Sequence, residues 1–389
     1  MALVSEEIVM KTVAETLFWL SLASIFYAYF GYPIVLWTLG RLWSRPVQRA
    51  PIRPSVSLII TAHNEEQTIR QKLENTLALE YPREHFEVIV ASDGSTDKTE
   101  EISRLYSPYG VRLVAQRERK GKEAAQRLAV EAACGDILIF TDVAVVLERD
   151  ALRNMVSNFA DPSVGCVSSE DRIVNAKGET SGENFYIRYE MWLRRLETQA
   201  NSLVGLSGSF FAVRKELCEG WSDRLASDFY LLLNAVRHGY RGISDPYSLG
   251  YYRAISSTEG EFQRKVRTAL RGITVFFATR EILNPAQYGL FSWQVISHKL
   301  LRWSVPLALL CLFLSNILLL GRRFYLVSFC LQSLFYLAAF VGYSCQPFHR
   351  HKLIKIPTFF SIVNLSIAIA WWRYLTGTRQ VLWAPTRRF

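Results

Sequence analysis

Residues 88–99 read VIVASDGSTDKT, an apolar run that ends in a turn of Asp, Gly, Ser and Thr. The apolar run is typical of a buried strand, and the residues after it are typical of a tight turn. Ser95 or Asp97 can cap a helix that begins near Lys98, but capping does not explain Asp93, which precedes the glycine. A carboxylate at the end of a buried strand therefore needs another explanation.

The chain around this stretch alternates short apolar runs with amphipathic segments, from Ser55 to about Val174. Apolar runs such as SVSLIITA and DILIFTD alternate with helix-like segments such as TIRQKLENTLAL and KEAAQRLAVEAA. This alternation predicts an α/β fold in which helices cover both faces of a parallel sheet. Such sheets bind ligands at the carboxyl ends of their strands, where the turn at 92–97 is expected to lie.

Three strand ends of the predicted sheet carry acidic or amide side chains. Residues 61–65 follow the first strand, residues 93–97 the second and residues 141–142 the fourth. Carboxylates brought together repel each other, so such a cluster usually meets a cation or the donor groups of a ligand. The structural alternative is that Asn64 caps a helix beginning near Glu66.

Lys122, in RERKGKEAAQRLA, follows the third predicted strand and opens a helix. A lysine at a helix N-terminus is electrostatically unfavourable unless an anion lies nearby, which indicates a phosphate ligand. A solvated surface lysine is the alternative.

Half of the 389 residues are hydrophobic, and they cluster in blocks long enough to cross a bilayer. Leu17–Leu39 has glutamates before it and arginines after it, which predicts a retained anchor with the following residues in the cytoplasm. A cleaved signal peptide is disfavoured because its positive residues would lie on the wrong side. The formal charge of +10 lies largely beside these blocks, so the lipid bilayer, and not nucleic acid, is the expected partner.

Further apolar blocks occur at 300–320, 324–344 and 356–372. Three full spans after a cytoplasmic domain would place the C-terminal tail outside, yet both residues 346–355 and the tail are basic enough to prefer the inside. We therefore expect one incomplete crossing. The block at 356–372 is short and carries polar residues, so it is the candidate for a re-entrant or interfacial segment.

The ordered motifs resemble membrane-bound family-2 inverting glycosyltransferases with a GT-A catalytic domain, which include cellulose, hyaluronan and chitin-oligosaccharide synthases and bacterial exopolysaccharide enzymes. The resemblance covers nearly the whole chain. It rests on SLIITAHNEE, EVIVASDGSTDKT, KGKEAAQRLA, ILIFTDVAVVLERDAL, VGLSGSFFAVRKEL, SDFYLLLNAVRHGYR, FQRKVR and LWAPTRR.

The resemblance implies a role for each matching residue. Asn64 and Glu65 match the first-strand signature at the nucleotide, and Asp93 matches the acid that contacts its base. Lys122 falls where the family has a lysine near the diphosphate, and Asp142 where it has the metal-binding acid. Asp228, in SDF, matches the general base that takes the acceptor proton. The structural alternative is that Asp228 or Ser227 caps the following helix.

The chain departs from the family pattern at several positions. The metal motif reads Asp142-Val143-Ala144, with one ligand where two polar groups are common. FQRKVR lacks the tryptophan of the processive QxxRW signature, so transfer of one sugar is better supported than a long polymer. In this segment Arg264, Lys265 and Arg267 hold either the diphosphate or lipid headgroups. Trp383 and Thr386 resemble a C-terminal motif that folds back toward the active site.

These observations predict an anchor and basic linker (1–53), a cytoplasmic GT-A domain (54–260), an interfacial amphipathic segment (261–299) and a C-terminal membrane region with a basic tail (300–389). The resemblance implies a multi-pass enzyme of the inner cell membrane that uses Mg²⁺ or Mn²⁺. It would transfer sugar from a nucleotide-diphosphate sugar, such as a UDP-sugar, to a saccharide or lipid-linked acceptor, and it allows synthase-complex subunits as partners. A catalytically silent nucleotide-sugar-binding scaffold is the alternative that Ala144 suggests.

Overall fold

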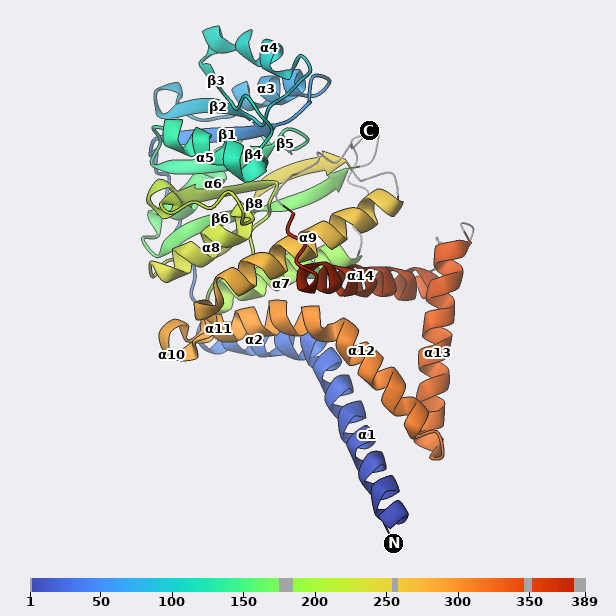
Figure 1. Ribbon diagram of the computed structural model, residues 1–389. Helices are drawn as coiled ribbons and strands as arrows, with labels where there is room; N and C mark the ends of the chain where they lie inside the picture. Colours follow the sequence, from blue (N-terminus) through green and yellow to red (C-terminus); the bar gives the residue numbers. More distant parts are fainter. Residues whose placement is uncertain (1, 175–184, 254–257, 346–351, 381–389) are drawn as a thin grey trace. The chain divides into compact units, whose positions relative to one another are not determined.

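The computed structural model describes residues 2–174, 185–253, 258–345 and 352–380 (Figure 1). The chain divides into two compact units. The sheet unit contains Leu36–Gly260 and Thr274–Gln294, and the helical unit contains Met1–Val35, Glu261–Ile273 and Val295–Thr378.

The sheet unit is built on one sheet of eight strands in the order β3-β2-β1-β4-β7-β6-β8-β5. The first four strands in this order are parallel, as the alternation predicts, but β7 runs antiparallel to both β4 and β6. The prediction of a parallel sheet is therefore correct for one half, and the whole sheet is mixed. The strands are β1 (Val56–Ala62), β2 (Phe86–Ser92), β3 (Val111–Ala115), β4 (Ile137–Asp142), β5 (Val146–Leu147), β6 (Val164–Val174), β7 (Phe210–Arg214) and β8 (Arg241–Arg253).

Helices cover both faces of this sheet, because alternate residues of each central strand point to opposite sides. Leu58 and Ile60 of β1 pack with residues of α3 (Ile69–Leu77) and α6 (Ala151–Ser157). Ile59 lies on the other face in a cluster with residues of α5 (Lys122–Ala132) and α8 (Ser227–Arg237). The remaining helices that lie within this unit are α4 (Thr99–Arg104), α7 (Phe185–Ala200) and α10 (Pro285–Tyr288).

Within the described residues, four helical stretches are long and apolar enough to cross a membrane: Glu6–Leu42, Leu290–Leu318, Arg323–Ser344 and Leu353–Leu375. The last is longer than the apolar block at 356–372, so that block is not too short to span; its re-entrant placement stays a prediction. The helices are α1 (Ala2–Phe26), α2 (Tyr32–Leu42), α11 (Leu290–Val295), α12 (Leu301–Leu318), α13 (Arg323–Ser344) and α14 (Lys352–Leu375), with α9 (Thr258–Ala278) contributing to both units.

A buried ion pair ties the segment before β1 to the starts of β6 and β8. Arg241 Nη2 lies 3.0 Å from Asp161 Oδ2, and the guanidinium also donates to the carbonyl oxygens of Arg45 and Pro46. Burial alone would raise the pKa of Asp161, but hydrogen bonds from Ser163 and Arg241 lower it to about 2. Because this value lies below the ordinary 3.8, the carboxylate stabilises the fold above about pH 4, and that contribution is lost as the pH falls toward 2.

We expect Asp161→Asn to destabilise the sheet unit by about 3 kcal/mol, because it leaves a buried guanidinium without its counter-charge. Thermal unfolding of the purified protein should show a lower Tm at pH 7, with the difference from wild type shrinking below pH 4. Asp150→Asn is the control, since the Asp150 carboxylate is only partly buried and lies 3.8 Å from Arg153. Equal Tm values for wild type and Asp161→Asn at pH 7 would contradict this account.

Candidate active site

The predicted site residues meet at the carboxyl ends of β1, β2 and β4. Thr61 of β1 is in register with Asp142 of β4, and Ala62 is in register with Ser92 of β2. The Asp93 amide continues the ladder by donating to the Ala62 carbonyl, at 2.9 Å. The parallel register therefore sets Asp93 and Asp142 on either side of the end of β1.

Asp93 is fully buried, and its two carboxylate oxygens have different surroundings. Oδ1 accepts hydrogen bonds from the backbone amides of Lys120 (2.8 Å) and Gly121 (2.9 Å) and from the Gln116 side chain (3.2 Å). Oδ2 accepts none from the described residues, and the nearest cationic atom is Arg119 Nε at 3.9 Å. A buried carboxylate oxygen in this condition favours a ligand that donates a hydrogen bond.

The turn after Asp93 requires glycine. Gly94 has a φ of +59°, and a Cβ there would lie 2.7 Å from the Arg119 backbone nitrogen. Only glycine can occupy this position without displacing the neighbouring loop. The predicted tight turn is therefore confirmed.

Asn64 and Glu65 connect the first two strand ends. The Asn64 side-chain oxygen accepts from the Thr96 amide at 2.8 Å, and the Glu65 amide donates to Thr99 Oγ1 at 2.7 Å. Asn64 does not cap a helix, since α3 begins at Ile69. Their contact with a nucleotide stays a prediction.

The Asp97 carboxylate also links the turn after β1 to the turn after β2. Its Oδ1 accepts from the Thr99 amide, at the first residue of α4, and its Oδ2 accepts from the Glu66 amide, both at 3.0 Å. The capping interpretation of Asp97 is therefore supported, whereas Ser95 contacts the Asn64 amide.

Lys122 and Asp142 form an ion pair at the centre of this edge. Lys122 Nζ lies 2.6 Å from Asp142 Oδ1 and donates to the Gly208 carbonyl at 3.0 Å. Lys122 is only 7% exposed, so its interpretation as a solvated surface lysine is wrong. The Lys122 ammonium is therefore bound to Asp142, the carboxylate that was predicted to bind a metal.

Asp228 lies beside the same glycine. A Cβ on Gly208 would sit 2.8 Å from Asp228 Oδ2, so the carboxylate packs directly against the glycine backbone. At the start of α8, Asp228 Oδ1 accepts a hydrogen bond from the Phe229 amide at 3.0 Å. The capping alternative is therefore supported for Asp228 and wrong for Ser227, whose Oγ donates to Gln126 Oε1 at 2.8 Å.

The donor set for a divalent ion is small. Among the residues that the structure describes, no group of three or more His, Cys, Asp or Glu side chains gathers closely enough to hold a metal. Asp142 offers one carboxylate and Ala144 offers no side-chain oxygen. Such a site fits an ion that takes most of its ligands from a bound diphosphate and water.

Two basic residues of the FQRKVR segment pair within their own helix. Arg264 and Lys265 are in the helical unit, where their side chains pair with Glu261 at 2.7 and 2.8 Å. Arg267 lies on the same helix, α9. Trp383 and Thr386 fall outside the described residues, so their predicted roles stay predictions.

Sequence reasoning missed Lys72, a buried lysine of α3 behind Asp142. Its Nζ donates to Val145 O at 2.6 Å and to Thr141 Oγ1 at 3.0 Å. Burial lowers the pKa of this ammonium to about 7, and the nearby Asp142 opposes that shift. The available signal was spacing, because Lys72 shares a helix face with Ile69 and Leu73.

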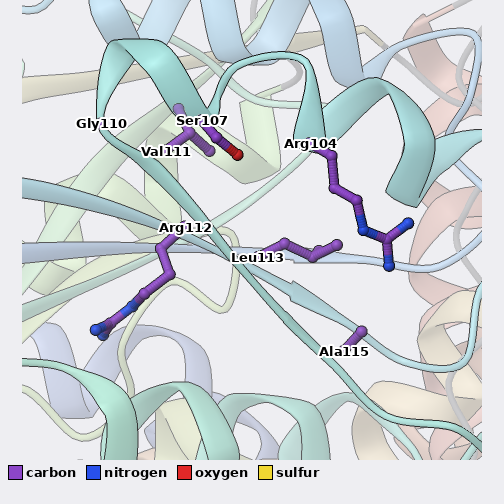
Figure 2. Close-up of a pocket in the computed structure, with 7 residues that line it drawn as sticks. All are labelled: Arg104, Ser107, Gly110, Val111, Arg112, Leu113 and Ala115. Atoms are coloured by element: carbon purple, nitrogen blue, oxygen red, sulfur yellow. The ribbon is translucent and has the colours of Figure 1, made fainter.

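One hollow of the sheet unit lies beside β3, away from the side chains described above. It has a volume of about 540 Å³ and runs along β3 at the sheet edge. Figure 2 shows its lining, which contains none of the predicted site residues: Arg104, Ser107, Gly110, Val111, Arg112, Leu113 and Ala115. The site is therefore defined by its converging polar groups and not by this hollow.

The sheet unit resembles proteins of known activity. Residues 57–221 match the sequence profile of Glycosyl transferase family 2. Poly-beta-1,6-N-acetyl-D-glucosamine synthase of Staphylococcus aureus is 28% identical over 255 residues, which cover 62% of this chain and 61% of the relative. Beta-monoglucosyldiacylglycerol synthase of Nostoc sp. is 30% identical over 184 residues, covering 45% of this chain and 39% of the relative. The matched part thus spans at most 61% of these curated relatives' length.

One solved structure resembles most of the chain. It is the mannosyltransferase PcManGT from Pyrobaculum calidifontis in complex with GDP-Man and Mn²⁺, with a TM-score of 0.70 and 24% identity. The likeness covers 94% of this chain and 99% of that one. It confirms the predicted GT-A type of α/β fold.

The ion pair predicts competition between Lys122 and a metal for Asp142. Lys122→Met should strengthen binding of Mn²⁺ to the nucleotide-free protein about tenfold, since a charge-assisted hydrogen bond of that strength is removed. Paramagnetic resonance of free Mn²⁺ during titration measures this. Lys98→Met, which removes an exposed cation near the same edge, should leave the affinity unchanged. Unchanged or weaker Mn²⁺ binding by Lys122→Met would show that the lysine does not compete.

Proposed function

The chain carries a glycosyltransferase family 2 domain at residues 57–221, and on that premise we propose that it is a membrane-bound inverting glycosyltransferase. Its donor would be a nucleotide-diphosphate sugar, most simply a UDP-sugar. Its acceptor would be a saccharide or a lipid-linked sugar of a cell-envelope glycan. Relatives named as a poly-N-acetylglucosamine synthase and a glycolipid synthase support both acceptor classes.

The contacts around Gly208 carry this proposal. Lys122 binds both Asp142 and the Gly208 carbonyl, and Asp228 packs against Gly208 from α8. A phosphate-binding cation, a metal-binding acid and a proton acceptor thus surround one backbone segment. Transfer of a sugar from a diphosphate requires these three groups close together.

Asp93 would hold the nucleoside end of the donor. Its Oδ1 is already saturated by donors of residues 116–121, whereas Oδ2 is open to a further donor. The imide N–H of uracil or the amide edge of guanine has the required polarity. With the base held at Asp93, the diphosphate would extend along β1 toward Lys122.

Lys122 and Asp142 would exchange partners when the donor binds. The ammonium turns to the diphosphate oxygens, and the released Asp142 carboxylate can hold Mg²⁺ or Mn²⁺. Such an ion would neutralise the charge that develops on the departing diphosphate. The complex of the Pyrobaculum enzyme with GDP-Man and Mn²⁺ supports this combination of ligands.

Asp228 would act as the general base. The acceptor hydroxyl attacks the anomeric carbon from the side opposite the diphosphate and gives its proton to the Asp228 carboxylate as the new bond forms. Attack from the opposite side inverts the anomeric configuration. The four membrane-length helices and the arginines after the first of them support a cytoplasmic site at the inner membrane.

We expect Asp228→Asn to lower the transfer rate by about a hundredfold to ten-thousandfold, the usual effect of losing a general base. Affinity for the nucleoside diphosphate should stay within about twofold, because the base acts on the acceptor. Asp223→Asn is the matched control, since Asp223 precedes the same helix and pairs with Arg127. A transfer rate for Asp228→Asn within about threefold of wild type would remove this residue from catalysis.

Asp93 and Asp142 should affect different parts of donor binding. Asp93→Asn keeps an oxygen for the amides of residues 120 and 121 but points an N–H₂ group toward the base, so nucleotide binding should weaken with or without metal. Asp142→Asn should chiefly abolish the strengthening of that binding by Mn²⁺. Calorimetry with UDP and GDP, each with and without Mn²⁺, distinguishes the two. Equal losses in both variants under both conditions would contradict these assignments.

A further inference from the structure

Helix α3 holds the loop that follows Asp142 at both of its ends. At the first end, Lys72 Nζ donates to Thr141 Oγ1 at 3.0 Å and to Val145 O at 2.6 Å. At the other end, the Asn75 side chain donates to Leu147 O at 2.8 Å and accepts from Leu147 N at 2.9 Å. Lys72 and Asn75 are three residues apart and therefore project from the same side of the helix.

The hydrogen bonds from α3 continue to the backbone of Asp142. The Thr141 hydroxyl that accepts from Lys72 donates in turn to the Asp142 carbonyl oxygen, at 3.3 Å. On the far side of the turn, Val145 is fully buried in the apolar cluster that contains Leu73. The loop is thus fixed by hydrogen bonds and by packing, and its freedom to reposition the Asp142 carboxylate is small.

A lysine is a costly residue for this position. Lys72 is 2% exposed, and burying an ammonium costs free energy unless hydrogen bonds replace its hydration. Its neighbours on the helix face, Ile69 and Leu73, belong to the apolar cluster, so a methionine would fill the same space without that cost. What a methionine lacks is the pair of bonds to residues 141 and 145.

We propose that Lys72 and Asn75 are positioning residues that hold the Asp142 loop ready for a metal–diphosphate complex. This inference rests on the proposed function. The need arises from Ala144: a second acidic ligand in the motif would help to fix the loop through the ion, but here one carboxylate must be placed by the protein alone.

The test is the extent to which Mn²⁺ strengthens nucleotide binding, measured on the full-length protein by calorimetry with UDP and GDP. We expect Lys72→Met to reduce this strengthening about tenfold while the affinity for metal-free nucleotide stays unchanged. Its Tm should be equal to or higher than that of wild type. Arg70→Met, which removes an exposed cation of the same helix, is the control and should match wild type.

Asn75→Leu provides a second variant that leaves Lys72 in place. It should also reduce the strengthening of nucleotide binding by Mn²⁺, by about threefold. This variant tests the inference if Lys72→Met does not fold. A normal Mn²⁺ effect in a folded Lys72→Met protein, or in Asn75→Leu, would overturn the inference. Wild-type protein that binds neither UDP nor GDP, with or without Mn²⁺, would instead overturn the proposed function and the inference with it.

Discussion

The ion pair between Lys122 and Asp142 is the interaction on which the site depends. A buried ammonium needs an anion, and Asp142 supplies it at 2.6 Å. A diphosphate can replace the carboxylate as partner of the lysine, and a divalent ion can then replace the lysine as partner of the carboxylate. Nucleotide and metal are therefore expected to bind together, because each removes the charge that opposes the other.

The two faces of the sheet contribute to this exchange in different ways. Helix α5 supplies Lys122, which can change its partner, and helix α3 supplies Lys72, whose bonds go to the loop and not to the carboxylate. Asp142 thus lies near two buried lysines, one paired with its carboxylate and one bonded to its loop. The parallel register of β1, β2 and β4 makes this arrangement possible, since it brings three strand ends to one edge.

The sequence alone allowed prediction of the part of the fold that its periodicity encodes. The alternation from Ser55 to Val174 identified the parallel strands, and the glycine of SDGS indicated the left-handed turn at Gly94. Strand direction after residue 174 was not predictable, because an apolar run such as FFAVR has the same pattern in either direction. Lys72 was missed because a lysine in an amphipathic segment is usually solvated, although its spacing from Ile69 puts it on the buried face of its helix. Capping by Asn64 was wrong for a related reason, since Thr96, far away in the chain, determines where that side chain lies.

The anomeric configuration of the product tests the central claim most directly. The purified protein would be incubated with a panel of nucleotide-diphosphate sugars, Mn²⁺ or Mg²⁺ and saccharide or lipid-linked acceptors, and the product linkage determined by proton nuclear magnetic resonance. Because the proposed mechanism has Asp228 deprotonate an acceptor that attacks opposite the diphosphate, we predict a transferred sugar whose anomeric configuration is inverted from that of the donor. A product that retains the donor configuration would contradict the account.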